Sequence, residues 1–217
     1  MSTHQSRRIA IYGAGRMGRG LSICFALAGW QITLIDSKSR IDWPAYKEGI
    51  EAEIAQTYDL LINLDLLPVG SEALMSERIA LFPIDEGLSS LSNADLVFEA
   101  VPETEVAKKE AFQKLDIVLP TEAIVASTTS TFLADLVAGW SRRPEYVLNA
   151  HFFNPAFLVP LVEVSPHVGT KSSATNELKD LLEEIGKVPV LCKASPGFIV
   201  PRIQALAMNE AARLVEE

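Results

Sequence analysis

RRIAIYGAGRMGRGLSICFALAGWQITLID, residues 7–36, is the segment that decides the fold. Its first six residues predict a short buried strand, and the next six, GAGRMG (13–18), have the spacing GxGxxG. The residues that follow have apolar positions at helical spacing up to about Gly29, and QITLID predicts a second strand that ends at Asp36. A strand, a glycine-rich turn, a helix and a second strand in this order predict a βαβ unit.

Strands and helices alternate along the rest of the chain. Helical periodicity covers residues 44–67, 103–119 and 171–185, and short apolar runs predict strands at 79–82, 95–98, 123–126, 146–150, 161–164 and 188–192. A turn around Phe-Asn-Pro joins the strands 146–150 and 161–164, which suggests an antiparallel pair. The predicted fold class is therefore α/β, a Rossmann-type, doubly wound, mostly parallel sheet with an antiparallel edge.

The run Ser195-Pro196-Gly197 predicts a boundary after the sheet. We expect residues 1–194 to form the α/β domain and residues 195–217 to form a linker and a helix. This helix reaches Glu217 without a cap or a glycine stop, which favours a truncated chain. We also expect exposed apolar surface on residues 199–215, and with it either dimerisation or poor solubility.

The composition is that of a soluble globular protein, with 48% hydrophobic and 22% charged residues. The net charge of −9 disfavours a nucleic-acid partner, whose phosphates require a basic surface. No run approaches the roughly 18 apolar residues of a membrane span, and the N-terminus lacks the apolar core of an export signal. Cys24 and Cys192 form no metal-binding pattern, so we expect no metal and reduced thiols in a cytoplasmic protein.

Each glycine of the GxGxxG pattern has its own physical reason. Gly13 permits a tight turn, Gly15 lets a ligand approach the backbone, and Gly18 lets the helix pack closely on the strand. The loop also contains Arg16 and Met17, and it would offer free N–H groups at a positive helix end to a pyrophosphate. Because the pattern lies between a strand and a helix, it predicts a dinucleotide site, with a glycine turn that binds no ligand as the alternative.

Asp36 lies at the end of the second predicted strand, close to the expected spacing of about 20 residues from the glycine loop. A carboxylate at this place accepts hydrogen bonds from the adenosine ribose hydroxyls and repels a 2'-phosphate. The predicted cofactor is therefore NAD rather than NADP, although Lys38 and Arg40 lie nearby and weaken this preference.

One of the three histidines lies where a general base could act. His151 ends a predicted strand, whereas His4 lies near the terminus and His167 in a predicted surface turn. A histidine suits proton transfer because its pKa lies near the working pH. If the two edge strands pair as a hairpin, Glu163 lies opposite His151, about 5 Å away at Cβ, and a glutamate in an apolar strand is costly unless paired. The pair is a candidate base with its partner; the alternative is a structural histidine and a solvent-facing glutamate.

Six segments in a fixed order are more specific than the glycine pattern. They are ADLVFEAVPE (94–103), ASTTS (126–130), AHFFNP (150–155), PLVEV (160–164), GKVPV (186–190) and SPGFIV (195–200). Together they resemble the 3-hydroxyacyl-CoA dehydrogenase family over nearly the whole chain. The resemblance implies NAD-dependent, reversible oxidation of the 3-hydroxyl of a 3-hydroxyacyl-CoA. It also implies that residues 195–217 are the linker and first helix of an all-α C-terminal domain, which closes the substrate cleft and supplies a homodimer interface.

The resemblance further implies roles for residues at the reacting centre. In the family, the residues that match His151 and Glu163 form the catalytic pair, and the residue that matches Ser130 bonds the reacting oxygen. Asn154 matches a position that lines the same pocket. For Ser130 the alternative, which could hold at the same time, is an N-cap of a helix over residues 132–138.

Glu103 and Lys108 match family positions that contact the ribose on the nicotinamide side of the cofactor. For Lys108 the alternative is a solvated helix face shared with Lys109. In the family, residues 44–67 would hold the acyl carrier, and in this chain they contain only one lysine, Lys47, so no basic cluster indicates a site for CoA phosphates.

The chain departs from the family at three positions. Thr128 stands where the family has the asparagine of ASNTS, and Pro201 stands where PGFxxNR has an asparagine that helps hold the substrate oxygen. Proline has no side-chain donor and no N–H, so it cannot make that contact. Pro160 begins PLVEVSPH, which resembles relatives that oxidise free hydroxy acids, such as gulonate and carnitine dehydrogenases.

Three functions therefore stay open. The first is a dehydrogenase of 3-hydroxyacyl-CoA thioesters, which the segments HFFNP and SPGF favour, and the second is a dehydrogenase of a free small 3-hydroxy acid. The third is an NAD-binding module without turnover, which Pro201 favours. The retention of Ser130, His151 and Glu163 together disfavours this module, because binding alone does not require them.

Overall fold

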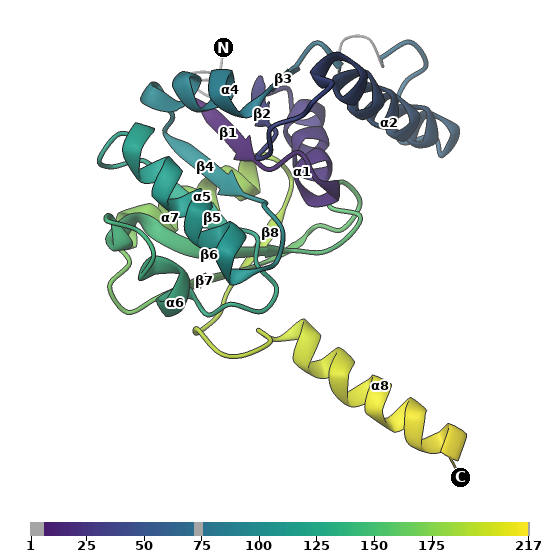
Figure 1. Ribbon diagram of the computed structural model, residues 1–217. Helices are drawn as coiled ribbons and strands as arrows, with labels where there is room; N and C mark the ends of the chain where they lie inside the picture. The colour runs from purple at the N-terminus through teal and green to yellow at the C-terminus, as the bar shows by residue number, and fades with distance from the viewer. Residues whose placement is uncertain (1–6, 72–75, 217) are drawn as a thin grey trace.

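The computed structural model describes residues 7–71 and 76–216, and an eight-stranded sheet with the order β3-β2-β1-β4-β5-β6-β7-β8 forms its centre (Figure 1). The strands are β1 (Ile9–Tyr12), β2 (Ile32–Ile35), β3 (Ile79–Phe82), β4 (Leu96–Glu99), β5 (Ile124–Ser127), β6 (Val147–Phe152), β7 (Leu161–Pro166) and β8 (Val188–Leu191). Strands β1 to β6 are parallel, β7 pairs antiparallel with β6, and β8 runs parallel to β7. The predicted mostly parallel sheet with an antiparallel edge is confirmed, and two strands make up that edge.

Helices cover both faces of the sheet because successive strand side chains point to opposite sides. Ile9 and Ile11 pack in one apolar cluster with α1 (Arg16–Leu27), α2 (Trp43–Asn63) and α7 (Ser172–Glu184). Ala10 and Tyr12 pack in the other with α4 (Ile84–Ser90), α5 (Glu105–Val118) and α6 (Ala134–Ala138). The order of the strands reverses between β1 and β4, and ligands of such sheets bind outside the carboxyl ends of the strands at this place.

The predicted elements lie within a few residues of the observed ones. Helix α2 ends at Asn63, before the predicted end at residue 67, and Asp65 then takes a left-handed conformation (φ 55°). Short elements were not predicted, namely α4 and the 3₁₀ turns η2 (Leu91–Asn93) and η3 (Pro144–Tyr146). They span seven residues or fewer, too short for a periodic apolar pattern to develop.

Helix α8 (Val200–Glu216) extends away from the sheet, at the lower right of Figure 1, and none of its residues is buried. The predicted exposed apolar surface on residues 199–215 is confirmed, with Ile199, Ile203, Leu206, Met208, Leu214 and Val215 exposed. Pro201 lies in the first turn, where a backbone N–H has no partner within the helix, so proline is tolerated there. The domain boundary at residue 194 stays a prediction. Within the described ranges, no helix is long and apolar enough to cross a membrane.

Candidate active site

The glycine loop joins β1 to α1, and two of its glycines are required by close packing. Gly13 has φ +123°, and a Cβ atom there would lie 2.4 Å from the Ala100 carbonyl oxygen. A Cβ on Gly18 would lie 1.9 Å from the carbonyl oxygen of Gly13. A Cβ on Gly15 would meet nothing within 4 Å, so this glycine faces open space at the N-cap of α1. The loop is therefore shaped to let a ligand approach the helix start.

A cleft of ≈ 250 Å³ lies in front of this loop. It is lined by Gly13, Ala14, Gly15, Arg16, Met17, Asp36, Ser37, Lys38, Arg40, Tyr46, Ala100, Val101 and Pro102. These residues come from the carboxyl ends of β1, β2 and β4 and from the start of α1 and α2, which is where the strand order reverses. The structure thus brings four of the predicted loop residues (Gly13, Gly15, Arg16 and Met17) and Asp36 to one cleft, whereas Gly18 is not among its lining residues.

Asp36 is buried at the edge of this cleft and is held by Arg40. The Arg40 Nε lies 2.5 Å from one carboxylate oxygen and its Nη2 lies 3.3 Å from the other. The guanidinium group also stacks over the Tyr46 ring at 3.8 Å from the centroid. A ribose that binds to Asp36 would therefore share the two carboxylate oxygens with Arg40. The pairing of Asp36 with Arg40 was not predicted from the sequence.

The candidate base lies at the antiparallel edge, in the predicted register. His151 on β6 is directly opposite Glu163 on β7. The His151 Nδ1 lies 2.8 Å from Glu163 Oε2, and its Nε2 lies 3.1 Å from the Ser130 hydroxyl. Histidine and glutamate are both buried, with Glu163 only 1% exposed. The solvent-facing alternative for Glu163 is therefore wrong, and the three residues form a continuous chain of polar contacts.

The second oxygen of Glu163 is bound by the start of α8. The backbone N–H groups of Ile199 and Val200 donate to Oε1 at 2.9 and 2.8 Å. Aromatic rings enclose the imidazole of His151, with Phe198 stacked at 4.8 Å and Phe153 edge-on at 4.7 Å between centroids. The imidazole ring is thus fixed by hydrogen bonds at both nitrogens and by apolar contacts.

Glu103 organises the loop that carries Ser130. One of its oxygens accepts bonds from the backbone N–H groups of Ser130 and Thr131, each at 3.0 Å, and from the hydroxyls of Thr129 and Thr131. Burial alone would raise the pKa of Glu103, but the charge of Lys108 and the threonine hydrogen bonds hold it below its usual value. Ser130 does not cap the next helix, because Leu133 is the N-cap of α6. The capping alternative for Ser130 is therefore wrong.

Lys108 is fully buried, which overturns the alternative of a solvated helix face. Its ammonium group lies 3.0 and 3.1 Å from the oxygens of Glu99 and 3.2 Å from Glu103. Lys109, the next residue, has a side chain that is 46% exposed and pairs with Glu105 on the surface of α5. Lys108 therefore forms ion pairs with two carboxylates, and one of them, Glu103, holds the Ser130 loop.

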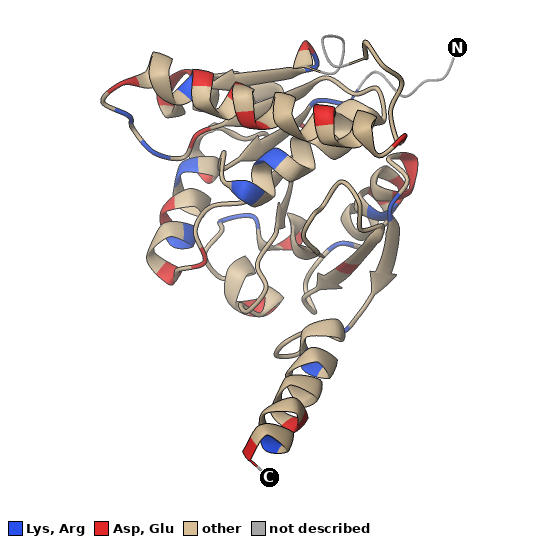
Figure 2. Cartoon of the chain, turned by 90° about the vertical axis from the view of Figure 1, so that its right-hand side faces the viewer, with Lys and Arg blue, Asp and Glu red and all other residues tan. Residues whose placement is uncertain are grey.

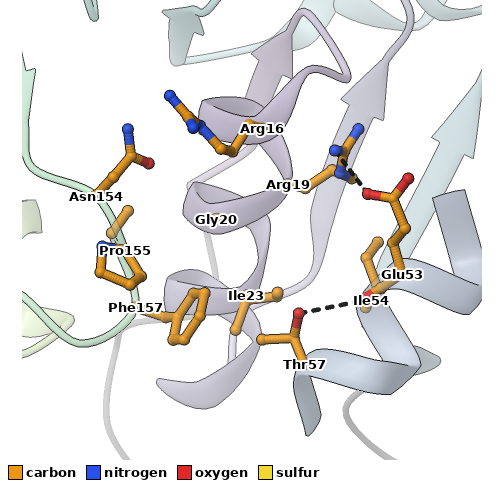
Figure 3. A pocket seen from close by; sticks show the side chains of 11 residues that line it. Arg16, Arg19, Gly20, Ile23, Glu53, Ile54, Thr57, Asn154, Pro155 and Phe157 are labelled. Atoms are coloured by element: carbon orange, nitrogen blue, oxygen red, sulfur yellow. Dashed lines mark hydrogen bonds and ion pairs between the residues drawn. The ribbon is translucent and has the colours of Figure 1, made fainter. Parts of the chain in front are cut away.

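Asn154 follows β6 and lines a second cavity of ≈ 350 Å³, which Figure 3 shows from close by. Its walls come from α1, α2 and the loop after β6, with residues Arg16, Arg19, Gly20, Ile23, Glu53, Ile54, Thr57, Asn154, Pro155, Ala156 and Phe157. The Arg19 guanidinium pairs with Glu53 at 2.7 Å. Arg16 lines both this cavity and the cleft of the glycine loop, so the two spaces adjoin at that residue.

Sequence reasoning missed four residues that support the site. Glu99 and Ser127 join the Lys108 network, Phe198 stacks on His151, and Lys187 donates to the carbonyl oxygens of Ala156 and Val159 in the loop after β6. Glu99 could have been found, because a carboxylate inside the apolar run of β4 is costly unless paired.

Known proteins match this chain along most of its length. A family model described as "3-hydroxyacyl-CoA dehydrogenase, NAD binding domain" covers residues 8–195. The chain is 32% identical over 209 residues to a 3-hydroxyadipyl-CoA dehydrogenase of Escherichia coli, which covers 96% of this chain and 42% of that protein. It is 31% identical over 210 residues to the human mitochondrial hydroxyacyl-coenzyme A dehydrogenase, with 97% and 66% covered. The chain thus spans less than half of the first relative and about two thirds of the second.

A solved structure shows the same architecture. The (S)-3-hydroxybutyryl-CoA dehydrogenase from Ralstonia eutropha matches with a TM-score of 0.85 at 30% identity, over 94% of this chain and 70% of the other.

Proposed function

This chain belongs to the 3-hydroxyacyl-CoA dehydrogenase family, and from that membership and the geometry of the site we propose that it oxidises the 3-hydroxyl of 3-hydroxyacyl-CoA thioesters reversibly with NAD. NAD is the cofactor of the domain that residues 8–195 match. The observation that carries the proposal is the chain of contacts from the exposed Ser130 through the buried His151 to the buried Glu163. A secondary alcohol loses its hydroxyl proton during oxidation, and this chain provides a base for that proton.

The residues of the glycine-loop cleft fit NAD. Gly15 leaves open space at the start of α1, where free N–H groups and the positive helix end favour a pyrophosphate. Asp36 would accept hydrogen bonds from the hydroxyls of the adenosine ribose, and its oxygens would accept from Arg40 at the same time. Glu103, whose side chain is partly exposed, holds the Ser130 loop and pairs with the buried Lys108. When bound, NAD accepts the hydride from carbon 3 of the substrate.

Hydrogen bonding assigns the proton on His151. Oε1 of Glu163 receives two backbone N–H bonds at the positive start of α8, an arrangement that suits an ionised carboxylate. An ionised carboxylate only accepts, so the Nδ1 of His151 carries the hydrogen and donates it to Oε2. The Nε2 then keeps its lone pair and can take the proton of the substrate hydroxyl, while Glu163 stabilises the imidazolium.

Ser130 orients the reacting oxygen in this scheme. Its hydroxyl lies 3.1 Å from Nε2 of His151, so an oxygen atom of the substrate that meets both groups receives a hydrogen bond and faces the base. Glu103 fixes the backbone of Ser130, which keeps the hydroxyl in place. Asn154, on the loop after His151, extends the polar lining toward the second cavity.

The second cavity is our proposed place for the acyl carrier. It adjoins the candidate base through the loop after β6, and its walls are apolar at Ile23, Ile54 and Phe157 (Figure 3). Arg16 is a cation at its border with the cleft and would attract a phosphate. A carrier with an apolar chain and an anionic phosphate group therefore matches the residues that line this cavity.

The second candidate function is oxidation of a free small 3-hydroxy acid, and the charge of α2 favours it. This helix carries Glu48, Glu51, Glu53 and Asp59 but only one lysine, and Figure 2 shows acidic residues along its surface. Of these acidic residues, Glu53 lines the second cavity, where it pairs with Arg19, and the negative charge of the rest of the helix disfavours the phosphates of CoA. Pro160 favours the same candidate, because it begins the segment PLVEVSPH, which resembles relatives that oxidise free hydroxy acids.

Cellular setting and assembly complete the proposal. We place the protein in the cytoplasm, in keeping with its two free cysteines, Cys24 and Cys192. We also propose a homodimer, supported by the exposed apolar residues of α8, and a small-molecule substrate rather than a nucleic acid, supported by the net charge of −9.

Loss of NADH absorbance with acetoacetyl-CoA tests the substrate. The proposal predicts NADH oxidation with this thioester and no reduction of NAD with gulonate or carnitine. Turnover of a free acid together with silence toward acetoacetyl-CoA would replace the first candidate by the second.

A further inference from the structure

The start of α8 makes contacts with both members of the candidate catalytic pair. Ile199 and Val200 donate their backbone N–H groups to Glu163, across 36 and 37 residues of sequence. Phe198, directly before them, lies parallel to the imidazole of His151, with an interplanar angle of 15°. The segment between the sheet and the outer helix therefore contacts the pair from two sides.

The backbone of this segment is held in an unusual conformation. Gly197 has φ +74°, and Phe198 has φ +48°, in a region that side chains other than glycine rarely adopt. Such conformations are energetically costly and persist where surrounding contacts fix them. Here the contacts are the burial of the Phe198 ring, which is 6% exposed, and the two N–H bonds to Glu163. The strain is thus offset at the catalytic pair itself.

Helix α8 has no buried residue of its own, so its place relative to the sheet depends on this segment. One carboxylate oxygen of Glu163 accepts the N–H groups at the start of α8, and the other contacts Nδ1 of His151. A shift of α8 would remove two donors from the carboxylate and the stacked ring from the imidazole together. The carboxylate would then be free to rotate, and the preference for hydrogen on Nδ1 would weaken.

We propose that residues 197–200 form a latch that fixes the tautomer and orientation of His151, so that the position of α8 controls proton transfer. Phe198 and the N–H groups of Ile199 and Val200 are positioning groups in this scheme, because they act through His151 and Glu163. The inference rests on the proposed catalytic role of His151. It adds that whatever displaces α8 also disables the base.

Two variants of the latch remove its contacts separately. Phe198→Ala removes the stacked ring, and Phe198→Tyr keeps it. Val200→Pro removes one N–H at the first position of α8, where proline is well tolerated. Leu206→Ala is the matched control, because it alters an exposed residue of the same helix away from the pair.

Nitrogen-15 NMR of the histidine side chains measures the tautomer of His151 and requires no turnover. The signal that is lost in His151→Asn belongs to His151. At a pH where the imidazole is neutral, the unchanged protein, Phe198→Tyr and Leu206→Ala should show hydrogen fixed on Nδ1. Phe198→Ala and Val200→Pro should show averaged tautomers, and their kcat should fall about tenfold to a hundredfold with the KM for NADH unchanged. A fixed Nδ1–H signal in both latch variants would overturn the proposal. A fixed tautomer in a protein that shows no turnover with any substrate would instead contradict the proposed function and leave the latch standing.

Discussion

Replacing Glu163 by glutamine removes one charge and leaves the shape of the side chain almost unchanged. The oxygen of the amide must stay toward the N–H groups of Ile199 and Val200, because the NH₂ group there would face two donors at 2.9 and 2.8 Å. The NH₂ group then faces Nδ1 of His151 and requires it to accept. The hydrogen of the imidazole moves to Nε2, which can no longer take a proton from the substrate.

The expected loss of kcat follows from a comparable exchange in another class of enzyme. The comparable exchange in serine proteases, where an aspartate that orients histidine becomes asparagine, costs a factor of about 10⁴ in kcat through the wrong tautomer. We expect Glu163→Gln to lower kcat by about 10³ to 10⁴, and to destabilise the fold by about 1.5–3 kcal/mol through loss of charge-assisted bonds.

The assay is NADH consumption in the presence of substrate, with NADH affinity measured separately by fluorescence titration. Affinity should be unchanged, because Glu163 does not line the glycine-loop cleft. Glu177→Gln removes a surface charge that pairs with Arg7 at 3.7 Å and serves as the control. A Glu163→Gln enzyme within tenfold of the original kcat would refute the assignment of the tautomer.

Three further predictions concern the cofactor cleft and the loops around it. Gly18→Ala should destabilise the chain by about 3 kcal/mol or more in denaturant unfolding, because the new Cβ meets the carbonyl oxygen of Gly13 at 1.9 Å; an unchanged midpoint would contradict the close packing of this loop. Asp36→Asn should weaken NADH binding about tenfold in a fluorescence titration and narrow its margin over NADPH, and tighter binding of NADPH than NADH by the unchanged protein would remove the role given to Asp36. Glu103→Gln should cost about 1–2 kcal/mol at neutral pH, allowing for the exposed part of the side chain. Because the folded pKa of Glu103 is lowered, this stability is present above the unfolded pKa and is lost as the pH falls through the folded pKa, so variant and parent should converge in acid; an equal gap at every pH would argue against the charge of Glu103 as its source.

The sequence predicted what depends on local pattern and on register. The βαβ unit follows from GxGxxG between a strand and a helix, and a hairpin over the edge strands places His151 opposite Glu163 by counting alone. Both expectations are confirmed in the structure. The cofactor-contacting and catalytic roles of the individual residues stay predictions.

What the sequence could not show are contacts between distant segments. Lys108 and Lys109 are adjacent and chemically alike, yet only tertiary packing decides that the first is buried between Glu99 and Glu103. The bonds from the start of α8 to Glu163 span more than 30 residues and depend on the left-handed turn at Phe198. Neither periodicity nor a motif encodes these pairings.

The central claim is that His151 is the base of an NAD-dependent dehydrogenase. The most direct measurement compares the original chain with His151→Asn, following NADH absorbance with acetoacetyl-CoA and NADH binding by fluorescence titration. We predict a loss of about a hundredfold or more in kcat with NADH affinity kept. An unchanged rate in the variant would contradict the claim and remove His151 from the mechanism.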